Sequence, residues 1–300
     1  MWIIFAFVSA ALLGLYDVAK KQSLQGNAVL PVLMINTVLC AILFVPFLIW
    51  HSKTCDGVMA YGDLHAHLLV MIKALIVLAS WVCGYYAMKH LPLTIVGPVN
   101  ATRPVMTLVG AVLIYGECLN AWQWSGVVLA FASLFMLSHS GKREDISFVH
   151  NRWVLLLCAA ALTGAMSGLY DKFLMSAVDL GGVGLDRYFV QGWYNIYQAF
   201  IMTAVMAFVW WPNRKQGNPF RWRWSIVFIS LFLTLADMAY FYALSCQGAM
   251  ISVVSMVRRG SVVVSFLFGA IMFREANLRS KAFDLLWVML GLLCLWIGSN

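Results

Sequence analysis

Apolar stretches of membrane-spanning length recur from one end of this sequence to the other, separated only by short polar segments. A helix needs about 20 residues to cross a bilayer. Of the 300 residues, 63% are hydrophobic and 11% are charged, values far from those of a soluble domain. The sequence therefore predicts an all-α polytopic membrane protein. We expect ten transmembrane helices, at residues 2–19, 29–50, 66–88, 93–115, 119–138, 153–175, 188–211, 224–244, 248–273 and 282–298.

Lysine and arginine gather at alternate ends of these spans. Loops on the cytoplasmic side of membrane proteins carry an excess of both residues. With the amino terminus outside, thirteen of the twenty fall on the cytoplasmic side, and only Lys53, Lys172 and Arg187 fall outside. The thirteen are Lys20, Lys21, Lys89, Lys142, Arg143, Arg152, Arg214, Lys215, Arg221, Arg223, Arg274, Arg279 and Lys281. We therefore expect both termini outside, in the cytoplasmic (inner) membrane of a bacterium.

The two halves of the chain repeat each other. "AALLGLYD" at 10–17 matches "GAMSGLYD" at 164–171. A second match, "YYAMKHLPLTIVGPVNATRP" against "FYALSCQGAMISVVSMVRRG", pairs Arg103 with Arg259. Because each half has five spans, the second copy enters the membrane upside down. An inverted repeat around a midplane site is a plan of secondary transporters, so we expect two inverted five-helix repeats.

Two long segments carry a resemblance to a known family. They are "LPLTIVGPVNATRPVMTLVGAVLIYGECLNAWQWSGVVLAFASLFML", 91–137, and "QGAMISVVSMVRRGSVVVSFLFGAIMFREANLRSKAFDLLWVMLGLLCLWIG", 247–298. Each has a long span that ends in an acidic residue (Glu117 or Glu275), then a short polar loop and a last span with glycine. With ten spans and this repeat, the chain resembles the EamA-type branch of the drug/metabolite transporter superfamily. The resemblance implies one EamA-type repeat at 1–141 and a second at 142–300.

Members of this family hold their substrate in a central cavity and work by alternating access, and the resemblance implies the same here. Their third, fourth, eighth and ninth spans line the cavity, with contributions from the first and sixth. The sugar-phosphate branch has a basic pair in the ninth span, where this chain has Arg258 and Arg259. It also has a lysine in the fourth span, where this chain has Asn100. That departure weakens the case for phosphate and leaves other anions open.

Three arginines lie deep inside predicted spans. Arg103 and Arg258 are each ten residues into a span, which at ~1.5 Å per residue puts them near the bilayer midplane. One arginine there costs about 2.5–3.5 kcal/mol. An ion pair between Asp237 and Arg259, which reach similar depth, would offset part of this cost. The remaining positive charges predict an anionic or zwitterionic solute, because a guanidinium binds carboxylate or phosphate through two parallel hydrogen bonds.

Other candidates have two interpretations each. Tyr16 and Tyr170, each followed by an aspartate, are either interfacial anchors or parts of a gate or cavity wall. Aromatic side chains either stack on a planar solute or pack against each other. The glutamates at the span ends either titrate in proton coupling or are solvated caps. The predicted substrate-binding residues are Arg103, Arg258, Arg259, Asp237, Asn100, Tyr86, Tyr242, Tyr16, Tyr170 and Trp81.

These features predict a secondary transporter, not an enzyme, that moves a small anionic or zwitterionic metabolite. No nucleotide-binding loop of the form G-x-x-x-x-G-K-[ST] is present in the sequence, so nothing supports ATP-driven pumping. The alternative is a membrane-embedded enzyme or translocase acting on a lipid-linked phosphate, for which the spans offer little acidic chemistry beyond Asp237. We expect no cofactor, metal or nucleic acid. The expected partners are the solute, the lipid bilayer, and a coupling ion (proton or sodium) or counter-substrate.

Overall fold

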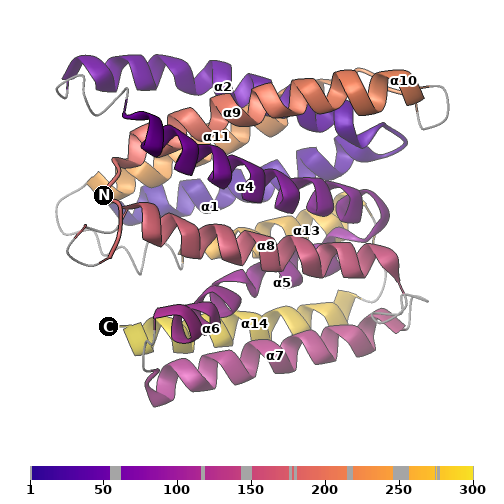
Figure 1. Ribbon diagram of the computed structural model, residues 1–300. Coiled ribbons are helices and arrows are strands. Elements are labelled where there is room, and N and C mark those ends of the chain that lie inside the picture. The colour runs from indigo at the N-terminus through magenta and orange to yellow at the C-terminus, as the bar shows by residue number, and fades with distance from the viewer. Residues whose placement is uncertain are drawn as a thin grey trace.

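The computed structural model of the chain describes residues 2–54, 62–115, 119–142, 151–175, 178, 181–214, 219–245, 257–273, 275 and 278–299. These residues are mainly helical and contain no strand (Figure 1). The helices are α1 (Trp2–Leu24), α2 (Val29–Thr54), α4 (Leu64–His90), α5 (Leu93–Ala101), α6 (Arg103–Tyr115), α7 (Ala121–Lys142), α8 (Arg152–Met175), α9 (Arg187–Val205), the π-helix η2 (Met206–Trp210), α10 (Trp211–Asn213), α11 (Trp224–Ser245), α13 (Ser261–Met272) and α14 (Leu278–Ser299).

Within the part of the chain that the structure describes, five helices are long and apolar enough to cross a membrane. They cover Ile3–Leu24, Val29–Trp50, Leu64–His90, Arg152–Met175 and Leu278–Gly298. Large apolar side chains such as Phe7, Trp50 and Leu113 are exposed on the outside of the bundle, where a soluble protein would carry polar groups. The chain is thus built as an integral multi-pass membrane protein.

The span predicted at 93–115 is interrupted, because α5 ends at Ala101 and α6 begins at Arg103. Thr102 closes α5 with its hydroxyl, which donates to the carbonyl of Val99 at 2.7 Å. Pro104 is the second residue after Thr102 and has no N–H to continue the hydrogen-bond ladder of α5. Broken helices at membrane depth occur where the freed backbone borders a cavity or is covered by protein. The interruption therefore points to this level of the bundle as a site.

Other boundaries also differ from the expected ones. α1 continues to Leu24, five residues beyond the predicted end at residue 19. The span predicted at 188–211 changes from α-helix to π-helix at Met206. Part of the span predicted at 248–273 lies outside the described residues, as does Glu117, and the described part contains α13.

The helices lie side by side along one common direction, and the two marked chain ends lie at the same end of the bundle (Figure 1). α1 packs against α11 and α13, whereas α8 packs against α4 and α6. α2 pairs with α9 at one edge, and α7 pairs with α14 at the other (Figure 1). α5 and α13 pack against each other in the interior.

The end of the bundle opposite the chain termini is rich in basic residues, and we call it the basic end. It contains the last turns of α1 and α4 and the first turns of α8, α11 and α14, with Lys21, Lys89, Arg152, Arg223 and Arg279 in or next to them. Hydrogen bonds join the segments that connect the helices at this end. Asn27 donates to the carbonyl of Arg221 at 2.8 Å, and Lys89 donates to the carbonyl of Asn27 at 2.8 Å. Ser23 donates to Ser225 at 2.7 Å.

Glycine sets the distance between α7 and α14. A Cβ added at Gly126 would lie 2.8 Å from the carbonyl oxygen of Gly291, and one at Gly291 would lie 3.1 Å from that of Gly126. Small residues at such crossings let two backbones approach closely in a membrane.

We expect Gly126→Ala to destabilise the protein by about 1–3 kcal/mol, because the added methyl meets backbone that cannot rotate away. The measurement is thermal unfolding of the purified protein in detergent. Gly84→Ala is the matched control, since its Cβ would lie at an ordinary 3.7 Å from Ala160. Equal melting temperatures for the two variants would contradict the close crossing of α7 and α14.

Candidate functional site

A cavity of about 160 Å³ lies in the interior, between the break in the α5–α6 segment and the basic end. Its walls come from α1, α4, the α5–α6 break, and the residues at and before the start of α13. Four of its lining residues are charged. The lining residues are Leu13, Tyr16, Asp17, Lys20, Ser80, Trp81, Gly84, Asn100, Ala101, Arg103, Arg259, Ser261 and Val262.

Arg103 reaches the cavity from the first residue of α6. Its guanidinium lies against Gly164 of α8, where an added Cβ would be 2.9 Å from the guanidinium carbon. Its Nε is buried without a hydrogen-bond partner among the described residues, and so is Oδ1 of Asn100 at the end of α5. Buried donors and acceptors are normally satisfied. Two residues of the cavity wall close to the helix break thus carry a buried unpaired donor and a buried unpaired acceptor.

Arg259 lines the same cavity and is exposed. It interacts electrostatically with Arg103 and Arg258, and both of these charges repel it. The described residues provide no carboxylate partner for its side chain. The repeat predicted that Arg103 and Arg259 converge, and the structure brings both to one cavity.

Asp17 and Lys20 add a second polar group to the cavity. They lie on adjacent turns of α1, and Asp17 interacts electrostatically with Lys20 and Arg103. The ammonium of Lys20 lies 4.0 Å from the ring centroid of Tyr85 and 5.3 Å from that of Tyr16. Aromatic faces stabilise a cation at such distances. Among the lining residues, three positive side chains therefore face one negative side chain.

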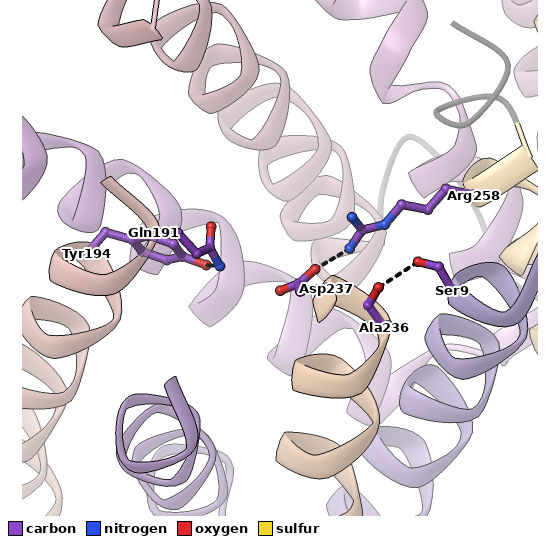
Figure 2. A network of polar contacts seen from close by, with 6 residues as sticks. All are labelled: Ser9, Gln191, Tyr194, Ala236, Asp237 and Arg258. Carbon is purple, nitrogen blue, oxygen red and sulfur yellow. Dashed lines mark hydrogen bonds and ion pairs between the residues drawn. The ribbon is translucent and has the colours of Figure 1, made fainter. Parts of the chain in front are cut away.

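Asp237 pairs with Arg258 (Figure 2). The expected pair between Asp237 and Arg259 is therefore wrong. The guanidinium of Arg258 also lies 4.4 Å from the ring centroid of Tyr240. Neighbouring residues on a helix point about 100° apart, so Arg258 turns toward α11 while Arg259 turns toward the cavity.

Figure 2 also shows how α1 and α9 lie around this pair. The hydroxyl of Ser9 donates to the carbonyl of Ala236 at 2.7 Å, which ties α1 to α11 beside Asp237. Gln191 donates to the hydroxyl of Tyr194 at 3.1 Å on α9. Asp237 and Arg258 thus belong to a polar cluster that does not line the cavity.

A second ion pair was missed by reasoning from the sequence. Nζ of Lys73 on α4 lies 2.6 Å from Oδ1 of Asp171 on α8, and 4.7 Å from the ring centroid of Tyr194 on α9. Lys73 is buried. Asp171 was considered only as a span-end cap or gate residue. The sequence signal was a lysine placed within an otherwise apolar span.

Three predicted tyrosines lie away from the cavity. Tyr86 packs against the largest apolar core. Tyr242 is 55% exposed, with its ring centroid 4.4 Å from that of Phe5. Tyr170 donates to the carbonyl of Leu69 at 3.2 Å. The cavity thus collects Tyr16, Trp81, Asn100, Arg103 and Arg259 from the predicted set.

Sequence reasoning did not include Asp17 and Lys20 in the predicted set. Because the first span was expected to end at residue 19, both were placed near a membrane surface. α1 continues to Leu24, which puts both residues within the helix.

Glu275 is not a solvated cap of its own span. Its carboxylate accepts hydrogen bonds from the backbone N–H groups of Leu93 at 2.5 Å and Thr94 at 2.8 Å, at the start of α5. The hydroxyl of Thr94 donates to the same carboxylate. An acidic side chain at a helix amino terminus satisfies free N–H groups and matches the helix dipole.

Comparison with known proteins supports the fold along the whole chain and the family through its first part. No curated protein matches the sequence. One solved structure, described only as a crystal structure of a protein, superposes with a TM-score of 0.61 over 96% of this chain and 94% of that chain. The two are 14% identical, so this likeness concerns the fold alone. Residues 1–139 match the EamA-like transporter family. The first part of the chain is thus similar to a family of transporters.

Proposed function

We propose that the chain is a secondary transporter of small zwitterionic or anionic organic solutes, and that the cavity beside Arg103 and Arg259 is its binding site. The observation that carries this proposal is that Nε of Arg103 and Oδ1 of Asn100 are both buried and unpaired among the described residues. Both residues line the cavity. A solute with an acceptor for the first atom and a donor for the second would satisfy both groups.

The size of the cavity supports a small solute. Its volume is about 160 Å³, and a cavity of ~150 Å³ in another protein is large enough to hold benzene. A compound of that size has a short carbon skeleton with room for one or two charged groups. Trp81 and Tyr16 provide apolar surface for that skeleton.

The cavity is lined by charges of both signs, which supports a zwitterionic solute, and its excess of positive charge also suits an anion. Arg103 and Arg259 offer guanidinium groups for a carboxylate, while Asp17 offers a carboxylate for an ammonium group. The ring of Tyr16 borders the same space and already lies near one ammonium, that of Lys20. A solute with charges of both signs meets complementary groups in each position.

The packing of the helices supports an alternating-access mechanism with two inverted repeats, 1–141 and 142–300. The contacts of α1 with α11 and α13 correspond to those of α8 with α4 and α6. The pairs α2–α9 and α7–α14 each join one helix from either repeat. Under this proposal the cavity lies between the two repeats, and rocking one repeat against the other exposes it to each side in turn.

Replacing either cavity arginine removes charge-assisted hydrogen bonds worth about 1.5–3 kcal/mol. We expect Arg103→Gln and Arg259→Gln each to lower uptake of zwitterionic solutes into proteoliposomes at least tenfold. Arg214→Gln is the control, since that arginine is exposed and lies against Trp211, away from the cavity. Full uptake by both cavity variants would remove the arginines from the mechanism.

Replacing Asp17 tests the preference for a zwitterion. Asp17→Asn leaves the volume of the side chain nearly unchanged and makes the cavity more positive. We expect the affinity for L-alanine to fall about tenfold, or ~1.4 kcal/mol, while that for succinate stays the same or rises. Ligand-induced thermal stabilisation of the purified protein measures both affinities. Parallel losses for the two solutes would contradict a selective role of Asp17.

A further inference from the structure

α5 and α13 lie between the cavity and the basic end of the bundle. α5 begins at Leu93 at the basic end and reaches the cavity with Asn100 and Ala101. α13 runs the opposite way, from Ser261 and Val262 at the cavity toward the basic end. Eight of the nine residues of α5 are buried. The two helices therefore form a packed barrier on this side of the cavity.

Small residues bring the two helices into contact. A Cβ added at Gly97 of α5 would lie 3.1 Å from Val262, and one at Gly269 of α13 would lie 3.4 Å from Cβ of Leu93. Such a contact buries little side-chain surface. Because few side chains interdigitate between the two helices, α5 and α13 can separate and pack together again.

Glu275 fastens this barrier at its outer edge. It follows α13 in the chain, but its carboxylate binds the backbone of Leu93 and Thr94 at the amino terminus of α5. The first N–H groups of a helix have no partner within the helix. Water can therefore take the place of the carboxylate without breaking α5. The contact is strong when closed and leaves both helices intact when open.

The start of α5 is held against α1, which belongs to the first half of the chain. Nζ of Lys21 on α1 donates to the carbonyl of Met88 at 2.8 Å and to that of Leu91 at 2.5 Å, which holds the turn between α4 and α5. Lys21 also interacts electrostatically with Glu275. The contact of Glu275 is thus a link between the first and second halves of the chain.

We propose that Glu275 is the latch of a gate formed by α5 and α13, and that its release opens the cavity to the basic end. This inference rests on the proposed transport function, because a gate needs a solute path. The inference specifies two further points: the barrier opens at the basic end, and the contact of Glu275 with α5 must break for it to open. Closure at this end is then a stable state of the cycle, and opening begins at the first turn of α5.

The test measures access to the cavity and needs no identified solute. Ser261→Cys places a thiol at the cavity-facing end of α13. A charged, membrane-impermeant methanethiosulfonate reagent is applied to right-side-out and to inside-out vesicles, with the chain lacking Ser261→Cys as background. We expect Glu275→Ala to raise the labelling rate at least tenfold from the vesicle face that exposes the basic end.

A matched variant separates a latch from general loosening. Asp63 also caps a helix, since its carboxylate accepts from the backbone N–H of Ala66 at 2.8 Å, but it does so at the opposite end of α4. We expect Asp63→Ala to leave labelling from the basic end unchanged. An unchanged rate in Glu275→Ala, or an equal rise from both faces, would overturn the proposal.

The converse experiment locks the gate. Cβ atoms at 93 and 269 would be 3.4 Å apart, close to the ~3.8 Å of a disulfide. In Leu93→Cys with Gly269→Cys, we expect oxidation to lower uptake of L-alanine into proteoliposomes at least tenfold and reduction to restore it. Uptake that persists with the disulfide verified by mass would overturn the gate. Absence of uptake by the unmodified chain would instead count against the proposed function, while the labelling experiment would still decide on the gate.

Discussion

A positive charge inside a membrane needs a counter-charge, an aromatic face or water, and the polar interior of this chain follows from that requirement. Arg258 has Asp237 and the ring of Tyr240. Lys73 has Asp171 and the ring of Tyr194. Arg259 has no such counter-charge among the described residues, and it borders the cavity together with Arg103. These cations thus fall into two groups. Arg258 and Lys73 form ion pairs between helices, whereas Arg103 and Arg259 border the cavity.

Hydropathy predicted most helices within a few residues, because the lipid requires long apolar segments whatever their packing. It did not predict the break at Thr102. That break depends on Pro104 and on a hydroxyl that bonds to Val99, and neither changes the apolar character of the segment. Nor did it predict the full length of α1, since lysines at 20 and 21 are tolerated at a helix end inside the protein.

The candidate site was predicted in part, and the reason differs between residues. Arg103 and Arg259 were paired through the repeat, because internal symmetry carries information about position in space. The partner of Asp237 was assigned by depth alone, which says nothing of the direction in which a side chain points. Arg258 and Arg259 are neighbours in the chain and lie at nearly equal depth. Arg258 pairs with Asp237, however, whereas Arg259 borders the cavity. For contacts between distant helices, such as Lys73 with Asp171, the sequence can mark a charged residue in an apolar span but does not identify its partner.

The contact between Arg103 and Gly164 has a consequence for how such a chain can evolve. The guanidinium occupies the space that any side chain at 164 would need. A larger residue at position 164 therefore requires the end of the Arg103 side chain to move away or to become shorter. A chain with this architecture that has lost the arginine is free to fill the hollow at 164, and it would thereby exchange a charged wall of its cavity for an apolar one.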